Sequence, residues 1–271
     1  MLTEVRQKKI YEYIRKHGTA KVADLHKLLN VSDMTIRRDL NELTERGLIT
    51  RVHGGAIIND IRELELSFQS RQVKYLEQKM AIARLAKESL FRNATIYLDG
   101  STTCNELAKL LSNDMDLIVF TDSLAVFLEL QNRDGVDTIL FGGMLEKDNN
   151  TLDGVLTVAT AEKITVDLCF FSARGFSVQS ISNAGMIGTN VKRIMLKNSK
   201  TRYLLADSSK YNQKGLFELC SWSDVDALIT DSCLESENLQ LLKAHGIDVR
   251  IAKLEEGAKD ESSSLARSGQ L

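Results

Sequence analysis

The stretch from Val22 to Leu43 constrains the fold more than any other part of this chain, because it reads as two short amphipathic helices joined by a turn. In the second helix, Ile36, Leu40 and Leu43 recur at helical spacing and form one apolar stripe. Ser32 stands just before this helix as a favourable N-cap, followed by an acidic residue that suits the helix dipole. The outer side of the helix presents polar and basic side chains from its first turns, namely Thr35, Arg37 and Arg38. Such a helix fits the major groove of DNA.

A basic hairpin follows these two helices. The pattern predicts a strand at residues 48–52 and a returning strand at residues 56–58. His53 and the two glycines after it are expected to form a tight turn between them. This order is typical of a winged helix-turn-helix, with Arg51 and His53 on the DNA backbone or in the minor groove. Instead of contacting DNA, His53 could only shape the turn. The alternative to a DNA-binding role for the whole region is a helical hairpin that only packs against the rest of the protein. The predicted DNA-binding residues are Ser32, Thr35, Arg37, Arg38, Arg51 and His53.

The charge of the chain is unevenly distributed. The formal net charge is −2 overall, yet residues 1–60 carry 11 Lys and Arg against 8 Asp and Glu, which leaves the remainder acidic. This asymmetry is typical of a DNA-binding module joined to a domain that does not bind DNA.

Cysteine usage and the first residues indicate the compartment. The cysteines form no Cys-x-x-Cys pair, which argues against a zinc site and a disulfide framework and fits a reducing environment. We expect them to be small buried residues at positions Cys104, Cys169, Cys220 and Cys233. The segment MLTEVRQKKI lacks the apolar core of a signal peptide, and no apolar run approaches about 20 residues. The sequence predicts a soluble, cytoplasmic protein without metal or cofactor.

From residue 76 onward, short apolar strands alternate with helices. After a helix at 76–91, the predicted strands are 95–98, 117–120, 138–141, 167–171, 203–206, 227–230 and 247–251. The helices between them are 104–111, 124–130, 155–163, 191–198 and 235–244. This pattern predicts an α/β domain with a mostly parallel sheet covered on both faces. The expected organisation is a winged helix-turn-helix domain at 1–58, a linker at 59–75, the α/β domain at 76–254 and a flexible tail at 255–271.

Polar and glycine residues follow these strands, at the edge where such sheets bind ligands. Residues 99–103 leave one strand and open a helix, so that Gly100 permits close approach while the hydroxyls and helix N–H groups suit an anion. A merely structural turn is the alternative. The cations that could face a phosphate are Lys192, near the start of a helix, and Lys210, for which a plain surface position is the alternative. The candidate ligand-binding set is Asp99, Gly100, Ser101, Thr102, Thr103, Thr121, Asp122, Ser123, Gly142, Gly143, Lys192, Asp207 and Lys210.

These motifs resemble the DeoR family of bacterial transcriptional regulators over roughly residues 3–255. The matching segments are VSDMTIRRDLNEL, RVHGGA, DGSTT, the glycine pair at 142–143, VKRIM, LLADSSK and VDALITD. The resemblance implies a sensor domain with a fold like ribose-5-phosphate isomerase, which binds a phosphorylated sugar and changes the DNA affinity of an oligomer. It also implies repression of a sugar-metabolism operon, and it assigns the strand-end residues to the effector site. A homo-oligomer is expected, because paired operator half-sites require a symmetric protein.

Two segments depart from the family pattern. Asp122 stands where the family usually has Asn, and residues 185–190 replace a commonly acidic run. A carboxylate near a phosphate is unfavourable unless a lysine offsets its charge or it binds sugar hydroxyls instead, so a non-phosphorylated effector stays open.

An isomerase fused to a DNA-binding head is the alternative function. Such an enzyme needs a base close to the substrate C–H. The candidate carboxylates are Asp99, Asp122 and Asp207, and none has a supporting partner in the sequence. No Ser-His-Asp set or metal cluster is evident either, so the sequence predicts no catalytic residues.

Overall fold

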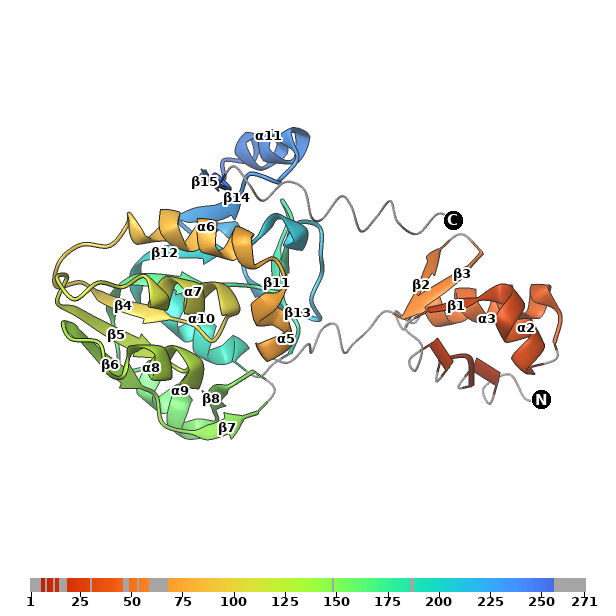
Figure 1. The fold of residues 1–271 in the computed structure, drawn as a ribbon, viewed down its shortest axis with the longest axis horizontal. Helices are drawn as coiled ribbons and strands as arrows, with labels where there is room; N and C mark the ends of the chain where they lie inside the picture. The colour runs from red at the N-terminus through yellow and green to blue at the C-terminus, as the bar shows by residue number, and fades with distance from the viewer. Residues whose placement is uncertain are drawn as a thin grey trace. The chain divides into compact units, whose positions relative to one another are not determined.

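A computed structural model describes residues 6–7, 9–11, 13–14, 19–29, 31–45, 49–52, 54–58, 68–147, 149–185 and 188–255 (Figure 1). The chain divides into two compact units, Met1–Glu65 and Leu66–Leu271. Most of the predicted linker and nearly all of the predicted tail lie outside the described residues, so those domain limits stay predictions.

The N-terminal unit is a winged helix-turn-helix, as predicted. Helices α2 (Val22–Leu29) and α3 (Asp33–Glu45) precede the wing strands β2 (Ile49–Val52) and β3 (Gly55–Ile58). An unexpected short strand, β1 (Thr19–Lys21), pairs with β3, so the sheet order is β1-β3-β2.

The inner side of α3 is fully used in packing. Ile36 and Leu40 join a buried cluster with Leu25, and the helical residues near the start of the chain contribute Ile10 and Ile14. Buried Asp39 accepts hydrogen bonds from Arg6 at 2.5 Å and 3.0 Å, which ties that first helical segment to α3. The opposite side of α3 is left for solvent.

The C-terminal unit contains a seven-stranded sheet in the order β15-β14-β12-β9-β4-β5-β6, and every neighbouring pair is parallel. Its strands are β4 (Thr95–Leu98), β5 (Leu117–Thr121), β6 (Val136–Leu140), β9 (Val166–Phe171), β12 (Ser199–Leu205), β14 (Ala227–Asp231) and β15 (Val249–Ala252). The chain first builds outward from β4 to β6 and then returns to place β9 on the other side of β4. The predicted parallel sheet is therefore confirmed, and its order reverses between β4 and β9.

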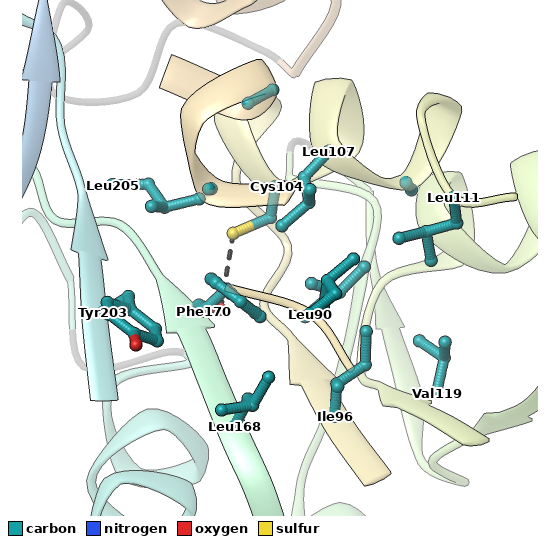
Figure 2. Close-up of a cluster of buried hydrophobic side chains, with 14 of the residues drawn as sticks. Leu90, Ile96, Cys104, Leu107, Leu111, Val119, Leu168, Phe170, Tyr203 and Leu205 are labelled. Carbon is teal, nitrogen blue, oxygen red and sulfur yellow. Dashed lines mark hydrogen bonds between the residues drawn. The ribbon is translucent and has the colours of Figure 1, made fainter. Parts of the chain in front are cut away.

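Helices cover both faces of this sheet. One apolar cluster packs beneath α6 (Leu76–Lys87), α7 (Thr102–Lys109) and α8 (Leu124–Leu130), and Figure 2 shows Cys104 of α7 donating to the carbonyl of Phe170 within it. A second cluster packs against the helices of the other face, which are α9 (Val155–Ala161), α10 (Thr189–Lys197) and α11 (Ser236–Ala244). These are the helices that the sequence predicts, with ends shifted by a few residues.

Several short elements were not predicted. They are helix α5 (Phe68–Val73), the hairpin strands β7 (Met144–Glu146) and β8 (Thr151–Asp153), a small sheet of β10 (Gly175–Phe176), β11 (Ile181–Asn183) and β13 (Phe217–Cys220), and the 3₁₀ turns η1 (Ser208–Lys210) and η2 (Trp222–Asp224). Helix α5 falls within the range expected to be linker.

The cysteines only partly match the expectation of burial. All four are free thiols; Cys104 and Cys169 are buried and Cys220 is partly buried, whereas Cys233 is exposed, so the prediction is wrong for that residue. Within the described residues, no helix has the length and apolar character needed to cross a membrane. The same part of the chain holds no group of three or more His, Cys, Asp or Glu side chains arranged for a metal ion.

Candidate functional site

The first turn of α3 is an exposed polar surface. Ser32 Oγ accepts a hydrogen bond from the Thr35 N–H at 3.3 Å and lies 2.9 Å from Thr35 Oγ1, as an N-cap should. Arg37 is exposed, and the Arg38 side chain is 81% exposed while it donates to Glu42 at 3.2 Å. Arg38 thus lies on the outer side of the helix, which Thr35 and Arg37 flank, and their contact with DNA stays a prediction.

The wing is described only in part. Arg51 of β2 is half-buried, and its Nη1 atom is buried with no hydrogen-bond partner among the described residues. His53 lies outside the described residues. The DNA-contacting roles of both residues stay predictions.

The centre of the second site is the point where the strand order reverses. Asp99 follows β4 and Ser172 follows β9, and the Ser172 N–H donates to Asp99 Oδ2 at 2.9 Å across the two strands. Open parallel sheets form a ligand crevice at this position, outside the carboxyl ends of the strands. Asp99 and Ser172 are both buried.

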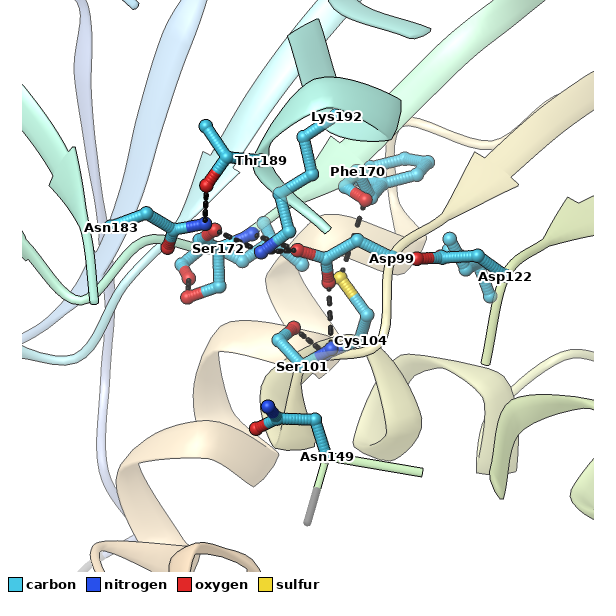
Figure 3. Close-up of polar contacts among 12 residues, drawn as sticks. Asp99, Ser101, Cys104, Asp122, Asn149, Phe170, Ser172, Asn183, Thr189 and Lys192 are labelled. Atoms are coloured by element: carbon cyan, nitrogen blue, oxygen red, sulfur yellow. Dashed lines mark hydrogen bonds and ion pairs between the residues drawn. The ribbon is translucent and has the colours of Figure 1, made fainter. Parts of the chain in front are cut away.

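Two lysines converge on this pair. Lys192 Nζ of α10 lies 2.7 Å from Asp99 Oδ2 and donates to the Ser172 carbonyl at 3.0 Å, as Figure 3 shows. Lys210 Nζ donates to Ser172 Oγ at 2.8 Å and lies 3.9 Å from Asp207 Oδ2. Both predicted lysines therefore reach the strand edge, from different elements.

Electrostatics distinguish the charged groups of this edge. Burial alone would raise the pKa of Asp99, but the Lys192 ammonium and hydrogen bonds from Ser101 and Ser172 outweigh burial and hold that pKa below its ordinary value. Burial lowers the pKa of Lys210. Asp99 is thus held as an anion, whereas the environment of Lys210 penalises its positive charge.

The end of β5 carries a second buried carboxyl group. Asp122 Oδ1 accepts a hydrogen bond from Tyr97 OH at 2.9 Å, and its Oδ2 is buried with no hydrogen-bond partner among the described residues. Burial and the nearby Asp99 charge raise the pKa of Asp122 to about 7. Near neutral pH, Asp122 is therefore protonated in much of the population and can donate a hydrogen bond, as an Asn would.

The hydroxyls beside these carboxylates have local backbone partners. Ser101 caps α7 by accepting from the Cys104 N–H, and Ser123 caps α8 by accepting from the Val126 N–H. Thr121 donates to the Leu98 carbonyl. The cap and turn roles explain these side chains structurally, and their contact with a ligand stays a prediction.

The remaining predicted residues divide into two groups. Thr102 and Thr103 are buried at the start of α7, and Asp207 is buried at the end of β12, where it accepts from Ser209. Gly100 is packed closely, since a Cβ there would lie 2.0 Å from Thr151 Cγ2. The other group is the exposed pair Gly142 and Gly143.

The glycine pair also has a structural explanation. Gly143 has φ +148, and a Cβ there would lie 2.1 Å from Thr157 Oγ1 and 2.7 Å from the Asp153 carbonyl oxygen. Gly142 accepts a hydrogen bond from Thr157 through its carbonyl. These contacts fix the β7–β8 hairpin, and no described contact joins the pair to the charged cluster at β4 and β9.

The candidate set from the sequence leaves out four cation or hydroxyl side chains that accompany this cluster. Ser172 is evident in the sequence as the polar residue that ends the predicted strand 167–171, although the set does not include it. The others are Arg71 of α5, Lys79 of α6 and Arg174, which lies beyond the end of β9. The charge of Arg71 interacts with the charges of Asp99 and Arg174. The charge of Lys79 interacts with those of Lys210 and Asp207.

Buried polar atoms without a hydrogen-bond partner also gather at this edge. Among the described residues, such atoms beyond the strand ends or at them include Thr103 Oγ1, Asn105 Oδ1, Asp122 Oδ2, Arg174 Nε and Thr230 Oγ1. A buried polar group without a partner costs about 1–3 kcal/mol, so a concentration of them indicates a polar ligand or ordered water.

A winged helix-turn-helix joined to an α/β domain with charged and polar side chains buried at the strand ends is the architecture of a transcription regulator with its own sensor domain. Family comparisons agree, since the DeoR-like helix-turn-helix domain matches residues 6–62 and the DeoR C terminal sensor domain matches residues 74–232. The chain belongs to the DeoR family of transcriptional regulators.

Relatives match almost from end to end. The HTH-type transcriptional regulator GolR of Listeria innocua is 33% identical, with 92% of this chain and 98% of that protein covered. The L-fucose operon activator of Haemophilus influenzae is 33% identical over 87% of this chain and 94% of its own length. The lactose phosphotransferase system repressor of Streptococcus mutans is 33% identical over 90% and 98%. These relatives are regulators and not enzymes.

Among solved structures, a D-ribose-5-phosphate isomerase in complex with phospho-erythronic acid matches with a TM-score of 0.38 and 14% identity, covering 50% of this chain and 54% of that one. A match at this level carries no inference about the site.

Proposed function

We propose that this protein is a sequence-specific repressor of a sugar-metabolism operon, and that a phosphorylated sugar bound in its C-terminal domain controls its affinity for operator DNA. It would act as a homo-oligomer in the cytoplasm. The observation that carries the proposal is the buried polar cluster at the β4–β9 reversal, where Asp99, Ser172, Lys192 and Lys210 converge.

The composition of this cluster suits a phosphorylated sugar. Lys210, and Arg174 near Arg71, offer positive charge to a phosphate, whereas the Asp99 and Asp207 carboxylates can accept hydrogen bonds from hydroxyls. A protonated Asp122 removes the objection that a carboxylate here would repel a phosphate, because it can donate as a neutral group. A ligand with one anionic end and several hydroxyls would satisfy both parts of the site.

The DNA side of the proposal rests on α3. Arg38 lies on its outward side, flanked by Thr35 and Arg37, where a recognition helix would meet base edges and phosphates. Control then requires that effector and operator prefer different arrangements of the oligomer. Relatives include a lactose phosphotransferase system repressor and an L-fucose operon activator, which supports regulation of sugar-metabolism genes. We propose that this protein represses its target genes.

A thermal-shift screen against sugar phosphates and their unphosphorylated parents tests the effector. A ligand at about 100 times its dissociation constant should add about 2.7 kcal/mol of stability. Lys210→Gln should abolish a shift caused by a phosphosugar, whereas Lys214→Gln, at an exposed lysine four residues on, should retain it. A shift by a neutral sugar alone would refute the phosphate assignment.

Selection of bound fragments from the source genome tests the DNA-binding half. We expect the protein to enrich a fragment upstream of sugar-metabolism genes, and the effector from the screen to release that fragment. Enrichment with no response to that effector would refute control by a phosphosugar while leaving DNA binding intact. Activation of a reporter by the protein would refute repression.

A further inference from the structure

Helix α5 is the first element of the C-terminal unit among the residues that the structure describes, and in the sequence it lies close to the boundary with the DNA-binding unit at residues 65–66. Its first residue, Phe68, is buried, and the helix packs against α7, whose start forms part of the strand edge. Arg71 Nη2 donates to Asn149 Oδ1 at 2.8 Å, in the turn between β7 and β8. The connection between the two units therefore ends in a helix that lies at the candidate site.

Lys79 of α6 fixes the other end of α5. Its side chain is buried, and its ammonium donates to the carbonyl of Arg71 and, at 2.5 Å, to the carbonyl of Lys74. These carbonyls close the last turn of α5, where a cation is favoured by the helix dipole. The corner between α5 and α6 also holds Tyr75 at φ +54. The position of α5 is thus tied to a buried positive charge.

That charge belongs to a cluster. Burial, and then the nearby charge of Lys210, lower the pKa of Lys79 to about 8, while burial lowers the pKa of Arg71 against the opposing effect of Asp99. Four acidic side chains lie near these cations, namely Asp99, Glu106, Glu146 and Asp207. The cations are five and come from separate elements: Arg71, Lys79, Arg174, Lys192 and Lys210. An anion entering this cluster would relieve the repulsion among them.

We infer that Arg71 is an anion-binding residue of the sensor site and that a bound anion holds α5 in place. Helix α5 is then the segment that transmits occupancy of the site to the DNA-binding unit. The inference deepens the proposed function and rests on it. The planar fork of Arg71 suits a phosphate, and its backbone carbonyl is held by Lys79, so that contact at the guanidinium restrains the helix itself.

Hydrogen exchange of the full-length protein tests this, with inorganic phosphate as the probe and chloride at equal ionic strength as the reference. Phosphate should slow amide exchange in peptides covering residues 68–80 and 99–108 by about fivefold or more. In Arg71→Gln, protection of 99–108 should persist at higher phosphate concentration, whereas protection of 68–80 should be lost. Arg71→Lys, which keeps the charge without the fork, should be intermediate.

Arg84→Gln is the matched control, because it removes a cation from α6 that pairs with Glu255 at 3.4 Å, outside the named cluster. It should behave as the unmodified protein. Phosphate protection at 99–108 without any at 68–80 would overturn the role of α5 alone, and so would unchanged protection of 68–80 in both Arg71 variants. Absence of protection in both peptides would overturn the inference together with the phosphate site.

Discussion

The two candidate surfaces of this protein use charge in opposite ways. On α3, Arg38 is 81% exposed and pairs with a partly exposed glutamate. At the strand edge, Lys192 and Asp99 are 13% and 0% exposed and share their partners with the backbone of Ser172. The first arrangement keeps a cation available to an outside partner, whereas the second holds charges at fixed positions inside the protein.

This difference indicates which substitutions should change ligand or DNA binding without changing the stability of the fold. An exposed ion pair contributes about 0–1 kcal/mol, because water screens it. Removing one member of a buried pair leaves a charge without compensation and costs about 3–5 kcal/mol. Substitutions at the strand edge should therefore alter stability as well as effector binding, while substitutions of exposed residues on the outer side of α3 should alter DNA binding alone.

The largest effect is expected for Asp99→Asn. It leaves the Lys192 ammonium without its carboxylate at 2.7 Å, so we expect a loss of about 3–5 kcal/mol in the free energy of unfolding by urea. Adding Lys192→Gln to this variant should recover a large part of the loss, because the two residues are directly coupled. A loss below about 1 kcal/mol, or a double variant as unstable as the sum of the single variants, would show that the pair is not buried and coupled as described.

An intermediate effect that depends on pH is expected for Asp122→Asn. The folded pKa of Asp122 is raised to about 7 by burial and by Asp99, so the folded protein binds a proton that the unfolded chain releases at lower pH. Stability from this group is therefore present in acid and is lost as pH rises toward the folded pKa. The Asn variant lacks this loss, so it should be more stable than the parent at pH 8 by up to about 4 kcal/mol and nearly equal at pH 4.

Urea unfolding of both proteins across this pH range checks the prediction. Tyr97→Phe is a useful companion, since it removes the hydrogen bond at 2.9 Å that lowers the Asp122 pKa and should destabilise the protein by about 1–3 kcal/mol. If the difference between Asp122→Asn and the parent does not change with pH, Asp122 is ionised in the folded protein throughout.

The fold was largely predictable from the sequence because its signals are local. Apolar runs ending in polar residues mark the strands, and helical spacing marks α3 and α6. The parallel pairing of β4 with β9 could not be predicted in this way. The two strands are separated by 67 residues, from Leu98 to Val166, and only tertiary packing brings them together. The place where the strand order reverses became evident only with the structure.

The candidate site shows the same limit. Asp99, Lys192 and Lys210 could be found as charged residues at strand ends and helix starts, and the structure brings them together. Arg71 could not, because it lies in the charged, weakly patterned segment that was expected to be linker. Lys79 could not, because the predicted helix at 76–91 shows only its apolar spacing, and the contact of Lys79 with α5 depends on tertiary packing. Ser101 and Ser123 serve as helix caps, and a ligand site would use the same residue type, so the sequence could not separate these roles.

The smallest effect on stability, and the sharpest separation of the two surfaces, is expected for Arg38→Ala. Its free energy of unfolding should change by less than about 0.5 kcal/mol, because the side chain is exposed and its pair with Glu42 is a surface pair. Affinity for the DNA fragment recovered by genomic selection should fall by about tenfold or more, as expected for loss of a base or phosphate contact.

Glu42→Gln is the control for this comparison, because it removes the charge of the partner at 3.2 Å and leaves Arg38 in place. That variant should bind DNA at least as tightly as the parent, since it loses a negative charge beside the recognition surface. Loss of affinity in Glu42→Gln equal to that in Arg38→Ala would mean that the pair only shapes α3. If Arg38 contacts a phosphate, its removal should reduce the salt dependence of binding by about one counterion, whereas relaxed sequence preference would identify a base contact.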